Sequence, residues 1–327
     1  MKVVFKYGLR AGLAAALALV IGAGSAFAAS WDMPTPYPDA TFHTVNINKF
    51  AEDVKAATNG DLTIKVHSAG SLFKHKQIKQ AVRSGQVPIG ELFMGLLANE
   101  DPVFAMDTLP FLASNYGEAT KLWAATKPKI DALLDKQGLM VLFSVPWPPQ
   151  GLYAKKLIDK ASDLKGIKFR AYNASTTRLA ELSGAVPTQI EVADLAQAFA
   201  TGRIEAMITS PSTGVSGKAW DYLSHFHHTQ AWIPKNVVVI NKAALAKLSP
   251  ATQKAVLAAA AKAEKRGWDM SKAETDSKIA ELKKNGVTIV TPSAALMGSL
   301  KKIGATMSAE WAAKAGDEGQ MLLKAYK

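Results

Sequence analysis

The feature that most constrains the fold of this chain is a helix–glycine–strand unit that occurs once in each half of the sequence. Residues 75–95 (HKQIKQAVRSGQVPIGELFMG) and 191–214 (EVADLAQAFATGRIEAMITSPSTG) each begin with an amphipathic helical pattern. Each pattern ends at a glycine suited to a helix C-terminus, Gly85 or Gly202, and a short apolar strand follows. A helix joined to a strand by a short link is typical of parallel α/β sheets. The sequence therefore predicts an α/β protein with two similar lobes.

A second constraint is a very long helical pattern near the C-terminus. It begins at Ser249-Pro250, a capping residue followed by proline at the first helical position, and it ends at Asn285-Gly286. If unbroken, such a helix is about 50 Å long at 1.5 Å per residue, which is longer than one small lobe. We expect it to lie across both lobes, with Gly267 as a position where it can bend.

Composition narrows the class of protein. The 327 residues are enough for two lobes with sizeable cores, and 48% of them are hydrophobic. The formal net charge of +12 is spread through Lys-rich helices, without a Lys/Arg block interleaved with aromatic residues, so we expect no nucleic-acid partner. The chain has no cysteine, which excludes a disulfide scaffold, a thiol nucleophile and a thiolate metal site.

The first 28 residues have the pattern of a secretory signal peptide. Three basic residues precede an apolar stretch at 11–20, and small residues follow up to Ala26-Phe27-Ala28. We expect cleavage after Ala28, which makes Ala29 the first residue of the mature chain and lowers the net charge from +12 to +9. A membrane anchor is the alternative, but the apolar stretch is shorter than the roughly 20 residues that a spanning helix needs. The predicted location is the periplasm.

In open α/β sheets, ligands bind outside the carboxyl ends of the strands. The loops expected there are 68–76, 92–97, 144–153, 170–176 and 209–214. Two lobes that face each other across these loops form a cleft that can close on a small molecule.

One strand at this cleft carries a cation. In GIKFRAYNAST, residues 166–176, alternation places Phe169 on one face and Arg170 and Tyr172 on the other. Asn173 then caps a helix that continues to Gly184. A strand with one solvated face is the plain interpretation, and a guanidinium that binds an anion is the functional one.

The sequence resembles the periplasmic solute-binding subunit of TRAP (tripartite ATP-independent periplasmic) transporters, the DctP-like family. The resemblance rests on FAEDVKAATNGDLTIKVHSAGSLF, on DTLPFLASNYGEA, and above all on ASDLKGIKFRAYNASTTRLAELSGAVPTQIEVADLAQAFATGRIEAMITS. It implies a receptor that captures an organic acid and delivers it to a sodium-driven pair of membrane permease subunits. It also implies two α/β lobes, hinge strands, a long helix across both lobes, and neither cofactor nor catalysis.

The predicted division of the chain follows from this resemblance. Residues 1–28 are the signal peptide. Lobe I is expected to contain residues 29–148 and about 236–275, and lobe II residues 149–235 and about 276–327.

The resemblance also implies roles for individual residues. Arg170 aligns with the signature arginine and would bind a ligand carboxylate through two parallel hydrogen bonds. Asn173 falls where the family often has a polar helper. The polar contact after the next strand falls near Ser210, with Thr213 close by, and Tyr37 lies where the first lobe often touches ligand.

One departure from the family pattern bears on the ligand. Many members have a second arginine where this chain has Tyr153, and the loss of that cation argues against a dicarboxylate. Aromatic residues could provide apolar walls and a phenol or indole donor; the candidates are Phe93, Trp147, Tyr153, Tyr172 and Trp232. We therefore expect a monocarboxylate with a hydrophobic, aromatic, or 2-oxo or 2-hydroxy portion.

Two other sequence motifs have a functional and a plain interpretation. His225, His227 and His228 are close in sequence, but no carboxylate lies beside them, so surface histidines near a lobe junction are favoured over a metal site. Ser71-Leu-Phe-Lys74 matches the S-x-x-K motif of acyl-transfer enzymes, but its companion motifs are absent. The remaining alternatives are an ABC-type solute receptor and an exported hydrolase.

Overall fold

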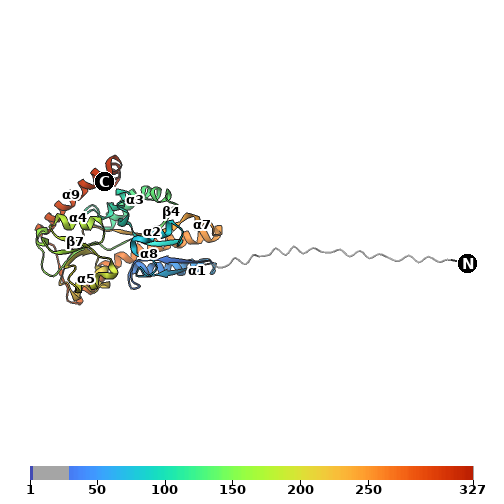
Figure 1. Cartoon of the computed structure of the whole chain (residues 1–327), viewed down its shortest axis with the longest axis horizontal. Coiled ribbons are helices and arrows are strands. Elements are labelled where there is room, and N and C mark those ends of the chain that lie inside the picture. Colours follow the sequence, from blue (N-terminus) through green and yellow to red (C-terminus); the bar gives the residue numbers. More distant parts are fainter. Residues whose placement is uncertain (3–28, 327) are drawn as a thin grey trace.

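The computed structural model describes residues 1–2 and 29–326 and has two lobes, one with two small sheets and the other with a six-stranded sheet (Figure 1). The predicted signal peptide, apart from its first two residues, lies outside the described residues. Strand β1 (Ala29–Pro34) begins at the residue predicted to start the mature chain. Within the described residues, no helix is long and apolar enough to cross a membrane.

Lobe I, as we use the name, is the half that contains a two-stranded and a three-stranded sheet. In the first, β1 pairs in parallel with β2 (Leu62–His67). In the second, β10 (Lys235–Asn241) lies between β3 (Ile89–Phe93) and β4 (Leu139–Pro146) and is antiparallel to both. The helices of this half are α1 (Phe42–Ala57), α2 (His75–Arg83), α3 (Tyr116–Asp135) and α7 (Lys242–Ala246), with the 3-10 helices η1 (Met94–Leu97) and η2 (Pro102–Thr108).

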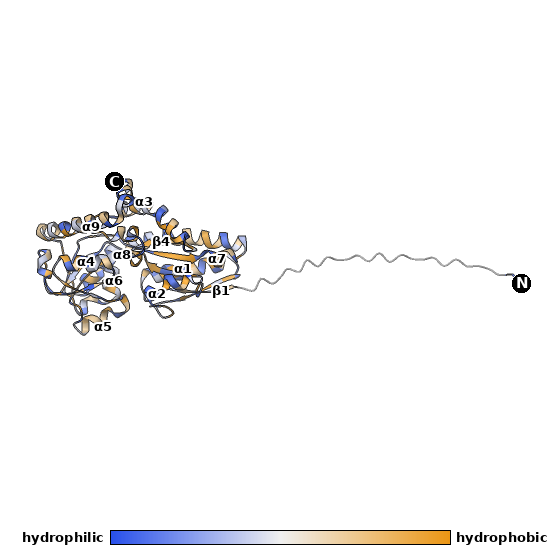
Figure 2. Cartoon of the chain, turned by 45° about the horizontal axis from the view of Figure 1, so that its top comes forward, coloured by the Kyte–Doolittle hydropathy of each residue, from blue (hydrophilic) through white to orange (hydrophobic). Residues whose placement is uncertain are grey.

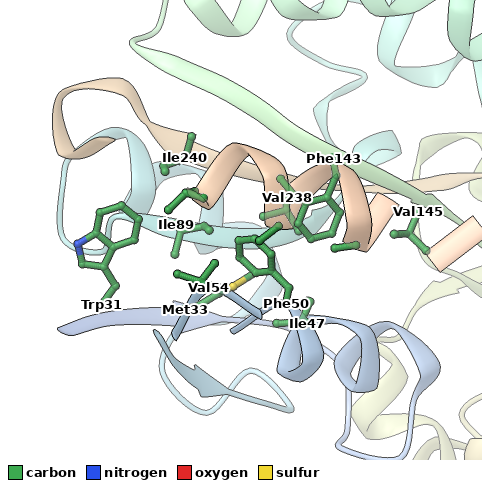
Figure 3. Packing of buried hydrophobic residues seen from close by; sticks show 14 of the residues in the cluster. Trp31, Met33, Ile47, Phe50, Val54, Ile89, Phe143, Val145, Val238 and Ile240 are labelled. Atoms are coloured by element: carbon green, nitrogen blue, oxygen red, sulfur yellow. The ribbon is translucent and has the colours of Figure 1, made fainter. Parts of the chain in front are cut away.

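The core of lobe I forms where α1 and β1 meet the three-stranded sheet (Figure 3). The buried residues Ile47, Phe50 and Val54 of α1 are spaced three and four apart, so they share one face of the helix. Phe50 meets Phe143 of β4 with ring centroids 5.2 Å apart. This packing fixes the strands that lead to the cleft.

Lobe II is the half that contains a six-stranded mixed sheet in the order β11-β9-β5-β8-β6-β7. Strands β8, β6 and β7 are parallel to one another, and β5 runs antiparallel to β8 and β9. The strands are β5 (Gly151–Ala154), β6 (Lys168–Ala171), β7 (Val186–Gln189), β8 (Ala206–Thr209), β9 (His225–His227) and β11 (Thr288–Val290). The short helices are η3 (Ala161–Leu164), α4 (Ala174–Leu182), η4 (Val192–Asp194), α5 (Leu195–Ala200), α6 (Pro211–Ser216) and η5 (Ala219–Asp221).

The two predicted helix–glycine–strand units are present, one in each lobe. In lobe I, α2 leads through Gly85 to β3, and in lobe II, α5 leads through Gly202 to β8. Both glycines have positive φ, +75° and +66°, the left-handed conformation that ends a helix and that glycine adopts without a Cβ penalty. The predicted two-lobe α/β class is confirmed.

Two chain segments cross between the lobes side by side. Residues 147–150 join β4 to β5, and residues 230–234 lead from β9 back to β10. The backbone N–H of Trp147 donates to the carbonyl of Pro234 at 2.8 Å, and that of Gln150 donates to Trp232 at 2.9 Å. The crossing is therefore a hydrogen-bonded ribbon, and we call it the crossover ribbon below.

The predicted long helix is confirmed as α8 (Pro250–Lys284), an unbroken helix of 35 residues. The Ser249 side chain accepts a hydrogen bond from the backbone N–H of Thr252, and Gly286, just beyond its end, has φ +91°. The helix packs against α1 and β4 in lobe I and against α6 and β11 in lobe II. It therefore spans both lobes.

A second long helix also contacts both lobes. Helix α9 (Ala294–Tyr326) packs against α4 and η3 in lobe II and against α3 and η2 in lobe I, and Figure 2 shows it running along the molecule to the C-terminus beside α3. Gly316 interrupts its helical conformation with φ +60°. The exact division of the chain between the lobes stays a prediction.

Substitution of Gly267 tests how closely α8 packs against β4 and α1. A Cβ at this position would lie 2.5 Å from Val145 Cγ2 and 2.8 Å from Asn46 Nδ2, so the glycine permits close packing of α8 on β4 and α1. We expect Gly267→Ala to lower the free energy of unfolding by about 1–3 kcal/mol, although alanine favours helix. In Gly298→Ala, the matched control in α9, the new Cβ meets nothing within 4 Å, so this change should be neutral or stabilising. Urea denaturation of both variants measures this, and equal effects would contradict it.

Candidate functional site

A small cavity lies between the lobes, against the crossover ribbon. The empty space in it measures about 390 Å³ when the open solvent at its mouth is included. Lobe I contributes Tyr37, His75 and Phe93, the crossover ribbon contributes Trp147, Gln150 and Pro234, and lobe II contributes Arg170, Tyr172, Glu191, Val192, Thr209 and Thr213. Six of the ten predicted site residues therefore meet at one cavity: Tyr37, Phe93, Trp147, Arg170, Tyr172 and Thr213.

The Arg170 guanidinium is the only Arg or Lys side chain in this lining. The residue is 2% exposed, its Nε donates to the carbonyl of Ile190 at 3.0 Å, and its Cζ lies 4.8 Å from the ring centroid of Tyr172. Among the described residues, no carboxylate lies within salt-bridge distance of it. Burial lowers the pKa of Arg170 to about 10, so the group is still charged at neutral pH. The cavity thus holds a buried cation whose terminal nitrogens can bind a planar anion.

Tyr172 and Phe93 form a contact between the two lobes. Their rings meet edge to face, with centroids 5.5 Å apart and an interplanar angle of 87°. The Tyr172 hydroxyl donates to Gln150 Oε1 and accepts from Trp232 Nε1, each at 3.2 Å. Trp232 is therefore a buried support behind Tyr172 and does not line the cavity. Burial raises the pKa of Tyr172.

Tyr37 and Trp147 form the neighbouring wall. Their ring centroids lie 5.0 Å apart at 70°, and both rings line the cavity. The Tyr37 hydroxyl and the Trp147 Nε1–H both donate to the side-chain oxygen of Asn236, at 3.1 and 3.0 Å. The polar atoms of these aromatic residues are thus engaged by the protein, although the sequence suggested Trp147 as an indole donor to ligand.

Glu191 and His75 bring opposite lobes together at the edge of the cavity, and the predicted site set contained neither. His75 begins α2, and its Nε2 accepts a hydrogen bond from the backbone N–H of Phe93 at 3.0 Å. Its Nδ1 lies 3.3 Å from Glu191 Oε2. Burial opposes ionisation of Glu191, but the hydrogen bond from His75 and the positive charge of Arg170 outweigh it and lower the pKa of Glu191. The cavity therefore also carries an anionic acceptor.

The turn after β8 places a hydroxyl at the cavity. Ser210 is the N-cap of α6, and its Oγ accepts from the backbone N–H of Thr213 at 3.0 Å. The same Oγ donates to Thr213 Oγ1 at 3.1 Å, which leaves the Thr213 proton free to donate into the cavity. Tyr153 is fully buried behind this turn, its hydroxyl donates to the Ser210 carbonyl at 3.2 Å, and it lies outside the lining. Ser210 and Tyr153 thus support the turn rather than face the cavity.

Asn173 lies at a separate groove outside the cavity. It is the predicted N-cap of α4, and its Oδ1 accepts from the backbone N–H of Thr176 at 2.9 Å. Its Nδ2 is buried without a partner among the described residues, near Gly95, where an added Cβ would lie 3.0 Å away. Both residues line the groove between α2 and α4.

The histidine cluster has structural contacts. His227 Nε2 accepts from the backbone N–H of Ile158 at 3.0 Å, and its Nδ1 lies 3.1 Å from the carbonyl of Leu152. Both ring nitrogens are engaged, so His227 has no lone pair to offer a metal. Within the described residues, no three His, Cys, Asp or Glu side chains are grouped to hold a metal ion.

The tautomer of His75 follows from its contacts and can be measured. Because the Phe93 N–H occupies the Nε2 lone pair within lobe I, the neutral ring must carry its proton on Nδ1, facing Glu191. We expect ¹⁵N NMR of the imidazole, assigned with His75→Asn, to report the Nδ1–H tautomer. A dominant Nε2–H signal would contradict this contact.

Comparisons with known proteins place this geometry in context. The family model described as bacterial extracellular solute-binding protein, family 7 (DctP), matches residues 36–314. Two similar solved structures are DctP6 and DctP7 of Bordetella pertussis, extracytoplasmic solute receptors binding pyroglutamic acid. They are 44% and 47% identical, each with a TM-score of 0.90, and the match covers 91% of this chain and 99% of theirs.

A third similar structure is a marine metagenome TRAP solute-binding protein specific for pyroglutamate, in complex with co-purified pyroglutamate. It is 43% identical with a TM-score of 0.89, and the match covers 91% of this chain and 98% of that chain. These relatives match the described chain across both lobes and therefore across the cavity between them.

Proposed function

The chain belongs to bacterial extracellular solute-binding protein family 7, and on that basis we propose that its cavity binds pyroglutamate, a five-membered lactam with one carboxylate. The chain is a TRAP-type solute-binding receptor for a small organic acid, and receptors of this family are extracytoplasmic binding proteins rather than enzymes. Three similar structures, at 43–47% identity, are described as binding pyroglutamate.

The observation that carries the proposal is the unpaired guanidinium of Arg170. Glu191 acts on this buried charge only from beyond salt-bridge distance, so a carboxylate bound in the cavity would give the guanidinium a direct partner. Because Nε is already bonded to Ile190, the two terminal nitrogens are left to bind both carboxylate oxygens. No other Arg or Lys lines the cavity, so its electrostatics favour a single carboxylate.

Glu191 supports a ligand that also donates an N–H. An anionic side chain in an anion-binding cavity would repel a second carboxylate on the ligand, which argues against dicarboxylates. The same carboxylate would accept a hydrogen bond from the lactam N–H, which lies next to the carbon that bears the carboxylate. This N–H takes the place of the 2-oxo or 2-hydroxy group expected from the sequence.

The rest of the lining suits a small, mostly apolar ring. The cavity walls are Phe93, Trp147, Tyr172, Val192 and Pro234. The free proton of Thr213 would donate to the lactam carbonyl. We therefore assign the carboxylate to Arg170, the N–H to Glu191 and the carbonyl to Thr213.

Delivery of the ligand is part of the proposal. After removal of residues 1–28 the receptor would act in the periplasm and transfer its ligand to the TRAP membrane permease pair. Contacts such as Phe93–Tyr172 and His75–Glu191 join the lobes only when the cleft is closed, so a ligand that binds both lobes stabilises that form.

Isothermal titration calorimetry with matched analogues tests these assignments. The analogue 2-pyrrolidone lacks the carboxylate, and 5-oxotetrahydrofuran-2-carboxylate replaces the N–H by a ring oxygen. We expect pyroglutamate to bind most tightly, the lactone acid to bind at least about tenfold more weakly, and 2-pyrrolidone not to bind measurably. Equal binding of the lactone acid would overturn the role of Glu191, and preference for a dicarboxylate would overturn the ligand assignment.

The substitution Arg170→Met separates an effect on ligand affinity from an effect on the free energy of unfolding. Loss of the carboxylate contact should weaken pyroglutamate binding by about 2–5 kcal/mol, while removal of an unpaired buried cation should leave the free energy of unfolding unchanged or higher. The matched control is Arg178→Met, because Arg178 is partly exposed and pairs with Glu181 and Glu310 on the surface. Near-native affinity in Arg170→Met would contradict the central assignment.

A further inference from the structure

Asn236 holds two walls of the cavity without lining it. It lies near the start of β10, is 1% exposed, and its Oδ1 accepts from both the Tyr37 hydroxyl and the Trp147 Nε1–H, at 3.1 and 3.0 Å. Tyr37 precedes α1, and Trp147 follows β4. One amide oxygen therefore fixes two aromatic rings, one from lobe I and one from the crossover ribbon.

The orientation of this amide is determined by its surroundings. An indole nitrogen can only donate, so the amide must present its oxygen to Trp147. Its NH₂ donates to Glu91 Oε1 at 2.8 Å and lies 3.3 Å from His43 Nδ1. Rotation of the amide by 180° would direct its oxygen at the Glu91 carboxylate, so this conformation is the one that satisfies both Trp147 and Glu91.

Glu91 is itself held in place within lobe I. It is 1% exposed, its Oε2 accepts from the Thr35 hydroxyl at 2.6 Å, and its Oε1 lies 3.1 Å from His43 Nδ1. Buried polar groups linked in this way define a specific arrangement, because each loses a partner if another moves. Thr35, His43, Glu91 and Asn236 all belong to lobe I, so the contacts among them do not depend on lobe II.

The network turns the polar atoms of two cavity walls away from the ligand. The Tyr37 hydroxyl and the Trp147 N–H face Asn236, so these residues present ring faces and carbon atoms to a ligand. On the other side, the Tyr172 hydroxyl faces Gln150 and Trp232. Without such partners, each aromatic donor could bind a ligand hydroxyl.

We propose that Asn236 is a specificity-determining positioning residue: by binding Tyr37 and Trp147 it removes two donors from the cavity and makes the receptor select against hydroxylated acids. This inference rests on the proposed function for the ligand and on the lobe I network for its mechanism. A hydroxyl that enters such a wall loses its hydrogen bonds to water and gains none, which disfavours sugar acids relative to an unsubstituted lactam.

Two measurements on Asn236→Ala test the proposal. The first needs no ligand: the ¹⁵N–H signal of the Trp147 indole, assigned with Trp147→Phe, should shift and exchange faster with solvent. The second is the ratio of dissociation constants for ring-hydroxylated and unsubstituted pyroglutamate, which should fall about tenfold, the worth of one hydrogen bond. The matched control is Asn241→Ala in the same strand, because Asn241 caps α7 and contacts no cavity residue.

The outcomes separate this inference from the proposed function. An unchanged ratio in Asn236→Ala, or the same change in Asn241→Ala, overturns the specificity role. If the wild-type protein does not bind pyroglutamate, the proposed function fails, and an indole signal that does not move then overturns the positioning role as well. Should Asn236→Ala not fold, Tyr37→Phe/Trp147→Phe removes both donors and leaves Glu91 its partners. In that double variant, a ratio of dissociation constants below that of the wild-type protein overturns the proposal. A ratio equal to or above the wild-type value supports it.

Discussion

The buried guanidinium of Arg170 is the group on which the rest of the site depends. It is placed by β6, its Nε is bonded to the carbonyl of Ile190 just after the neighbouring strand β7, and one of its faces lies over Tyr172. These contacts orient the side chain but do not neutralise it. A parallel pair of strands thus directs a charge into the space between two lobes, and the lack of a carboxylate within salt-bridge distance of it, in the described part of the chain, is the reason we propose this cleft as an anion site.

The architecture around this charge allows the cleft to close without losing its geometry. The crossover ribbon joins β4 and β10 of lobe I to β5 and β9 of lobe II through paired backbone hydrogen bonds, while α8 and α9 each pack against both lobes. Rigid connections of this kind confine motion to a few residues of the ribbon. The cavity lies against that ribbon, so we expect closing of the cleft to bring Arg170 and Glu191 of lobe II towards His75 of lobe I, across Trp147, Gln150 and Pro234.

Sequence patterns predicted those elements whose causes are local. The helix–glycine–strand units and the ends of α8 depend on glycines and caps within a few residues, and Arg170 is found by alternation along a single strand. Glu191 and His75 were missed because their contact joins residues 116 positions apart, and in the sequence each resembles an ordinary helix start. Tyr153 and Trp232 were expected as walls, but Tyr153 of β5 packs into the interior of lobe II, and Trp232 of the crossover ribbon packs behind Tyr172. The direct roles of the site residues and the exact lobe boundaries stay predictions.

The measurement that tests the central claim most directly is the identity of the small molecule that the receptor carries. Protein purified under native conditions without added ligand would be denatured, and the released solute identified and quantified by mass spectrometry. The account predicts pyroglutamate, with up to one molecule per chain, and none from the Arg170→Met variant. Release of a dicarboxylate or a sugar acid from the wild-type protein, or of pyroglutamate equally from both proteins, would contradict it.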